Sequence, residues 1–156
     1  MSTLAVQVAL DANDRERRRL VVLLAGLDDA ALSEGVEGRW TVAAKFAHLA
    51  YWDRFALALL DRWARGEDYA TDTLPSFHDD VLNDAMLTEQ LALPPQEAGR
   101  LAIAAAGAID AALHALPPET AARLLTDHDA AWLLRRSEHR AEHLHEIEAA
   151  LGLLGC

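Results

Sequence analysis

The strongest constraint on the fold is a helical repeat of apolar side chains in residues 41–65. At 100° per residue, His48, Trp52 and Phe55 fall within about 60° of one another. The same stripe continues through Ala56, Leu59 and Trp63, whereas Asp53, Arg54, Asp61 and Arg65 fall on the far side and are expected to face solvent. The pattern predicts a long amphipathic helix with Thr41 as its N-cap and His48 inside its buried stripe.

A second stripe of the same kind lies near the C-terminus. Counted from Trp132, the side chains of Arg136, His139, His143 and Ile147 fall within about 80° of one another. His145 falls on the opposite face. We expect one helix that begins near Asp127 or Asp129, either of which can cap it, and that runs to about Leu153.

In the rest of the chain, helix-breaking residues separate further helical segments, as in a helical bundle. A first helix is predicted over 3–27, followed by a loop to Trp40, and the Pro94-Pro95 and Pro117-Pro118 pairs bracket a third long helix. Residues 66–76 read as a loop, and 78–93 as a short or irregular helical segment. Apolar residues make up 52% of the chain, and alanine and leucine supply most of them. We predict a single all-α domain over 1–156, an antiparallel four-helix bundle with a short extra helical segment between its second and third helices.

Charge and composition exclude several classes of partner. The net charge of −11 would repel a phosphate backbone, so nucleic-acid binding is not expected. No 18-residue apolar run is present, and Leu4–Leu10 lacks the basic residues that precede a signal sequence. The single cysteine, Cys156, is the last residue and forms no disulfide within the chain. We therefore expect a cytoplasmic protein with no membrane partner.

Three histidines form a candidate metal site. His139 and His143 are four residues apart on one helix face, so their imidazoles can reach the same ion, and His48 can face them from the second helix. Three neutral imidazoles leave a position open, which is typical of a catalytic site, and they favour zinc or nickel over magnesium. Taken singly, each histidine is more often structural than ligating. The remaining histidines are expected to be solvated: His78, His114, His128 and His145.

The two stretches together resemble the DinB/YfiT-like family. The resemblance is carried by Trp40-Thr41, Ala47-His48-Leu49 and Trp52, then by His139 and His143 followed by Ile147. It implies a four-helix bundle, a metal held by the three histidines, and a possible homodimer. It also implies relatives that include metal-dependent thiol S-transferases and mycothiol-dependent maleylpyruvate isomerase, beside protective proteins without an evident metal. Many members carry Gln three residues after the last histidine, where this chain has Glu146.

Two classes of function fit these residues. As an enzyme, the protein would use a metal to activate a small thiol cosubstrate against an electrophile, because Cys156 is not placed to be the nucleophile. Trp52 and Phe55 could wall the pocket, and Arg136 could pair either with a carboxylate of the cosubstrate or with an acidic neighbour. Glu146 is the carboxylate nearest the histidine stripe and a weak candidate for the general base of a metal-dependent hydrolase. Alternatively, the bundle binds a small molecule without turnover.

Overall fold

The computed structural model describes residues 3–67, 77–126 and 130–155. Within these ranges the chain forms eight helices and one small antiparallel sheet, which confirms the all-α class. The elements are α1 (Thr3–Ala25), α2 (Asp29–Ser33), β1 (Gly35–Glu37), β2 (Trp40–Thr41), α3 (Val42–Ala64), α4 (Phe77–Ala92), α5 (Pro95–His114), α6 (Pro118–Thr126), α7 (Ala131–Leu134) and α8 (Arg136–Ala150).

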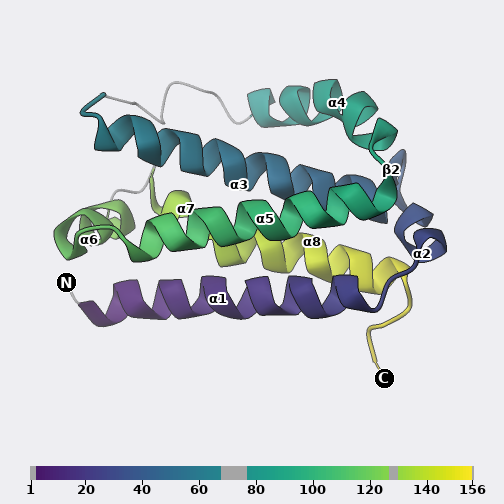
Figure 1. Cartoon of the computed structure of the whole chain (residues 1–156), viewed down its shortest axis with the longest axis horizontal. Coiled ribbons are helices and arrows are strands. Elements are labelled where there is room, and N and C mark those ends of the chain that lie inside the picture. The colour runs from purple at the N-terminus through teal and green to yellow at the C-terminus, as the bar shows by residue number, and fades with distance from the viewer. Residues whose placement is uncertain (1–2, 68–76, 127–129, 156) are drawn as a thin grey trace.

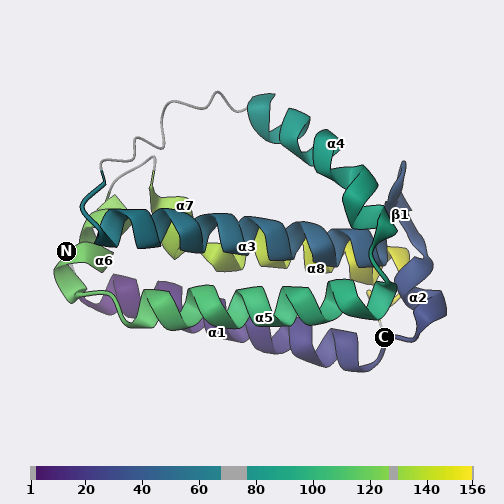
Figure 2. The ribbon, with the colours of Figure 1, turned by 45° about the horizontal axis from the view of Figure 1, so that its top comes forward.

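Four long helices, α1, α3, α5 and α8, form the bundle. α3 packs against α5 and α8, and α1 packs against α8 and α5. α1 and α8 run in one direction and α3 and α5 in the other, so the antiparallel pairs are α1 with α5 and α3 with α8 (Figure 1). This order arises because α4 carries the chain back along the outside of α3 before α5 begins (Figure 2).

The connection between the first two long helices holds more structure than the predicted loop. Asp28 caps α2, since its Oδ1 accepts the N–H of Ala31 at 2.8 Å. β1 then pairs with β2, with Gly35 opposite Thr41. Thr41 is the N-cap of α3 as predicted, and its Oγ1 accepts the N–H of Ala44 at 3.1 Å. The hairpin therefore sets where α3 begins, six residues before His48.

Two further helical segments differ from the sequence prediction. The segment expected to be short or irregular is the regular 16-residue helix α4. Pro117 stops α5 as expected, but Pro118 begins a new helix, α6, because proline suits a first helical turn, where an N–H needs no partner. α6 caps the end of the bundle beside α7, against which it packs.

The predicted single C-terminal helix is broken. α7 ends at Leu134, Arg135 has φ −99° and ψ 53°, and α8 begins at Arg136. The expected caps Asp127 and Asp129 lie outside the described residues, and α8 ends at Ala150 rather than Leu153. The break is pinned by the buried Asn13 of α1, whose amide nitrogen donates to Leu134 O and whose Oδ1 accepts the N–H of Ser137, at 2.8 and 2.7 Å. These hydrogen bonds satisfy backbone groups that a helix interruption exposes.

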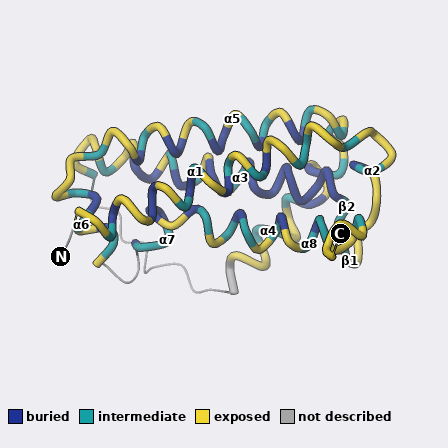
Figure 3. Tube along the Cα trace, turned by 90° about the horizontal axis from the view of Figure 1, so that it is seen from below, coloured by how far each residue is buried: buried dark blue, intermediate teal, exposed yellow. Residues whose placement is uncertain are grey.

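Burial is most continuous at the start of α3. Its residues from Val42 to Ala50 are all buried, Lys45 and His48 included, because the bundle, the hairpin and α4 surround them (Figure 3). One prediction for α3 was wrong: Asp53 is only 1% exposed, whereas Arg54 and Asp61 do face solvent. Asp53 is buried because two arginines of α8 meet it across the bundle.

Among the described helices, none is by itself long and apolar enough to cross a membrane. α5 and α6 reach the necessary length and composition only when taken together, and the chain bends by 110° between them.

Candidate metal centre

The three predicted histidines meet between α3 and α8. His48, His139 and His143 each offer a nitrogen that lies within 4.8 Å of those of the other two. His48 Nε2 and His139 Nε2 are 3.1 Å apart, and the ring of His143 lies edge-on to both, with centroids 4.6 and 4.7 Å away. Their convergence follows from the one-turn spacing on α8 and the antiparallel packing of α3 against it. The prediction that these imidazoles come together is confirmed.

Burial keeps two of these rings neutral, those of His48 and His139. Burial is the main cause that lowers the pKa of His48 to about 3, and the neighbouring His143 is the next. Burial also lowers the pKa of His139, with the guanidinium of Arg136 as the next cause. At neutral pH both rings are therefore unprotonated imidazoles, the form in which histidine binds a metal.

A carboxylate orients the third ring. His143 Nδ1 lies 2.7 Å from Glu146 Oε2 and donates to it, so Nε2 is the nitrogen left to bind a metal. The same oxygen of Glu146 receives the buried ammonium of Lys45 at 2.8 Å. Burial opposes ionisation of Glu146, but these two hydrogen bonds lower its pKa. A carboxylate behind a histidine fixes the ring's tautomer and raises its basicity as a ligand.

The outer ring nitrogen of His139 faces a cation, whereas that of His143 faces a carboxylate. Arg136 Nη2 lies 3.3 Å from His139 Nδ1, and because a guanidinium can only donate, Nδ1 accepts. The proton of the neutral ring then sits on Nε2 and is shared with His48 Nε2. Arg136 is itself 3% exposed and donates its Nε to Asp53 Oδ1 at 2.9 Å. Of the two roles considered for Arg136, the structure therefore shows the ion pair with an acidic neighbour.

Beneath the histidines lies a buried ionic network that the sequence reading missed. Arg140 is fully buried and binds Asp110 through both carboxylate oxygens at 2.9 Å and Asp53 Oδ2 at 3.0 Å. Its remaining N–H groups reach the backbone oxygens of Asn13 and Ala106. One signal was available: Arg140 lies one helical turn after Arg136, close to the histidine stripe.

The centre opens into a cavity of about 1060 Å³ between α3, α4 and α8. Its walls include the predicted Trp52, Phe55 and Arg136. Trp52 donates its Nε1–H to Asn83 Oδ1 of α4 at 3.0 Å, and Phe55 stacks on Trp132 with centroids 6.3 Å apart. The α4 contribution was not predicted, because residues 78–93 show only weak helical periodicity.

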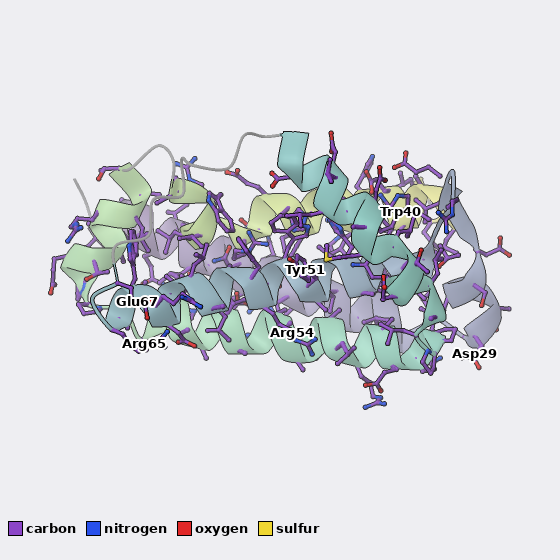
Figure 4. The ribbon with its side chains drawn as sticks, turned by 90° about the horizontal axis from the view of Figure 1, so that it is seen from above. Asp29, Trp40, Tyr51, Arg54, Arg65 and Glu67 are labelled. Carbon is purple, nitrogen blue, oxygen red and sulfur yellow. The ribbon has the colours of Figure 1, made fainter. Side chains whose placement is uncertain are left out.

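Trp40 completes the cavity wall on the hairpin side. Its ring meets that of His48 edge-on, with centroids 5.5 Å apart, and the Lys45 ammonium lies 5.1 Å from its centroid. Figure 4 shows Trp40 at the hairpin end of α3, whereas Arg65 and Glu67 lie at the opposite end of that helix. The histidine centre therefore occupies the half of the bundle that the hairpin and α4 cover.

The family assignment rests on a match over most of the chain. The sequence model of the DinB superfamily matches residues 12–147, a range that contains all three histidines. The chain belongs to the DinB superfamily. No curated protein and no solved structure matches it significantly.

The residues of this DinB-superfamily chain fit a divalent metal. The donor set is three imidazoles beside an open cavity, and a 3.1 Å separation of two nitrogens is close to what two Zn–N bonds of about 2.0–2.1 Å require. His48, His139 and His143 would hold the ion. One contact has to change: an ion that takes Nε2 of His139 places the ring proton on Nδ1, where it faces Arg136.

The other histidines lie away from the centre wherever they are described. His145 is exposed on α8, as predicted, and His114 is exposed and 3.1 Å from Asp14. The side chain of His78, and the whole of His128 and Cys156, fall outside the described residues.

Proposed function

We propose that this DinB-superfamily protein is a metal-dependent enzyme that transfers a small thiol to an electrophile. The observation that carries the proposal is the convergence of three histidines on one side of a cavity large enough for a cosubstrate and an acceptor. The three rings would supply all the protein ligands, and the cavity side would stay accessible to substrate.

The chemistry needs a thiol from outside the chain. The sequence contains one cysteine, at the last position, so the nucleophile is a low-molecular-weight cosubstrate. A divalent ion, when bound, would lower the pKa of that thiol. The sulfur forms a bond to an electrophilic carbon, the leaving group departs with its bonding electron pair, and the thiol proton goes to solvent. Trp52 and Phe55 would hold the apolar part of the acceptor.

Glu146 is assigned here a positioning role, which favours the transferase over a hydrolase. A hydrolase would use it as a general base toward water, but its carboxylate already accepts from His143 and Lys45. Those bonds lower its pKa and weaken it as a base. Replacing Glu146 with Gln should weaken metal binding by about 10–100-fold while leaving all three imidazoles in place.

The metal is tested by elemental analysis of protein purified without a nickel column. We expect about one zinc or nickel ion per chain, and His139→Ala should lose most of it. His145→Ala on the exposed face of the same helix is the matched control and should keep full occupancy. Full metal occupancy in His139→Ala would refute the three-histidine metal site, and the proposed metal-dependent enzyme with it.

Turnover is tested with small thiols and a generic electrophile, beside a chelated sample. The transferase predicts product only when both thiol and metal are present. Thiol-independent hydrolysis that Glu146→Gln abolishes while the variant still holds its metal would establish the hydrolase instead. Metal occupancy without any turnover would leave a small-molecule-binding bundle.

We further propose a cytoplasmic location, no nucleic-acid partner and a homodimer. The exposed Leu4, Val8 and Val22 of α1 support the dimer, because they place apolar surface on the outside of the bundle. Light scattering at micromolar concentration checks this, and a monomeric mass would exclude it.

A further inference from the structure

The cavity beside the histidines carries an excess of negative charge. Six carboxylates line it, against two cations. The carboxylates belong to Glu37, Asp79, Asp80, Asp84, Glu142 and Glu146, and the cations to Lys45 and Arg136. A divalent ion on the histidines would offset only half of this excess of four charges.

Both cations are already engaged by carboxylates. Lys45 contacts Glu146 at 2.8 Å and Glu37 at 3.4 Å. Arg136 is paired with the buried Asp53, which is not among the lining residues. Among the described lining residues, no cation is therefore left to receive an anionic substrate. A carboxylate or phosphate entering the cavity would have to displace one of these ion pairs.

The acidic residues surround an aromatic wall rather than a plain surface. Asp80 and Asp84 of α4 and Glu142 of α8 are exposed, and the rings of Trp52 and Trp132 line the same cavity. Aromatic faces and carboxylates both attract cations, and their attraction adds when an apolar body carries an ammonium group.

A separate feature marks this cavity as a binding site. His48 lines it, is 4% exposed, and its Nδ1 has no hydrogen-bond partner among the described residues. A buried polar atom without a partner is costly, and in native proteins such an atom calls for an explanation such as strain, a catalytic role, or a bound water or ion. The carboxylates therefore border the part of the cavity where the chain keeps this cost, beside the histidine centre.

We propose that the substrate of this site is a cation, an amine or quaternary ammonium on an apolar body, and that anionic thiols and acceptors are excluded. This substrate class rests on the proposed function for its chemistry, but its charge selectivity is a property of the cavity alone. The carboxylates of α4 and α8 act as specificity residues, and the aromatic wall holds the apolar body.

Tryptophan fluorescence tests the selectivity without turnover, since Trp52 and Trp132 line the cavity. Metal-free protein is titrated at low salt with 2-phenylethylammonium and with 3-phenylpropionate, so that a carboxylate gains nothing by ligating an ion. We expect the ammonium to bind at least about tenfold more tightly, and the preference to shrink at high salt. Equal affinities, or tighter binding of the carboxylate, would overturn the proposal.

A pair of variants on α4 locates the effect. Asp84→Asn removes a cavity carboxylate and should reduce the ammonium preference, by about twofold or more. Glu89→Gln removes an exposed charge from the same helix outside the cavity and should leave the preference unchanged. An equal change in both variants would mean that the acidic surface as a whole causes the ammonium preference. The assignment of the preference to the cavity would then be wrong.

Thiol assays separate this proposal from the transferase. With metal-loaded protein, the rate relative to the uncatalysed reaction of the same thiol should rise more for cysteamine than for 3-mercaptopropionate. A larger relative rate for the anionic thiol would keep the transferase and overturn the charge selectivity. Absence of turnover with either thiol, beside a retained ammonium preference in fluorescence, would refute the transferase and support the selectivity.

Discussion

Asp53→Asn is the most informative single substitution in this protein. Asp53 is 1% exposed and accepts hydrogen bonds from Arg136 Nε at 2.9 Å and Arg140 Nε at 3.1 Å. With Asp110, which also accepts from the half-buried Arg17, it balances the two buried arginines of α8. The amide keeps the shape of the side chain and removes its charge.

The expected cost follows from which cation is left alone. Arg140 keeps its bidentate partner Asp110, but Arg136 loses its carboxylate while staying buried. Breaking a buried ion pair by removing one partner costs about 3–5 kcal/mol, because the other charge remains desolvated and unpaired. For a domain of this size that corresponds to a fall in Tm of roughly 6–20 °C.

Urea unfolding followed by circular dichroism measures the change. Asp61→Asn, on the exposed side of the same helix, is the control and should stay within about 0.5 kcal/mol of the wild type. The double variant Asp53→Asn with Arg136→Met restores neutrality and should be more stable than Asp53→Asn alone. A double variant no more stable than the single one would refute the charge-balance reasoning.

Three further predictions concern stability. Because the pKa of His48 falls from 6.5 in the unfolded chain to about 3 in the folded one, the unfolded state binds more protons below pH 6.5. His48 alone should therefore contribute a loss of about 1.4 kcal/mol per pH unit in the metal-free protein as the pH drops below 6.5, and His48→Gln should reduce the slope of stability against pH in urea unfolding. Gly107→Ala should raise the urea midpoint, with a gain of about 0.5–1 kcal/mol in stability, because a Cβ at this position meets nothing within 4 Å. Gly99→Ala should gain less, because its Cβ would meet a leucine carbon at 2.6 Å. Equal gains in the two variants would contradict this reasoning. Thr41→Ala should cost about 1 kcal/mol by thermal melting, and no loss would mean that the hairpin alone sets the start of α3.

Several features were readable from the sequence because they depend on neighbours along the chain. The period of the apolar residues around His48 identified α3, and the four-residue spacing of His139 and His143 put both imidazoles on one face of α8. Thr41 was recognisable as an N-cap because capping is a contact with the next three residues. The convergence of the three histidines required only that these two faces be buried against each other.

The tertiary structure alone decided what stands behind and around those histidines. Asp53 looked solvated because its neighbours along α3 include charged residues, yet it is buried, since the arginines that neutralise it come from α8. The break at Arg135 likewise depends on Asn13, more than a hundred residues earlier. A charge is stable in a protein interior only beside its partner, and a partner on another helix leaves no periodic signal in the local sequence.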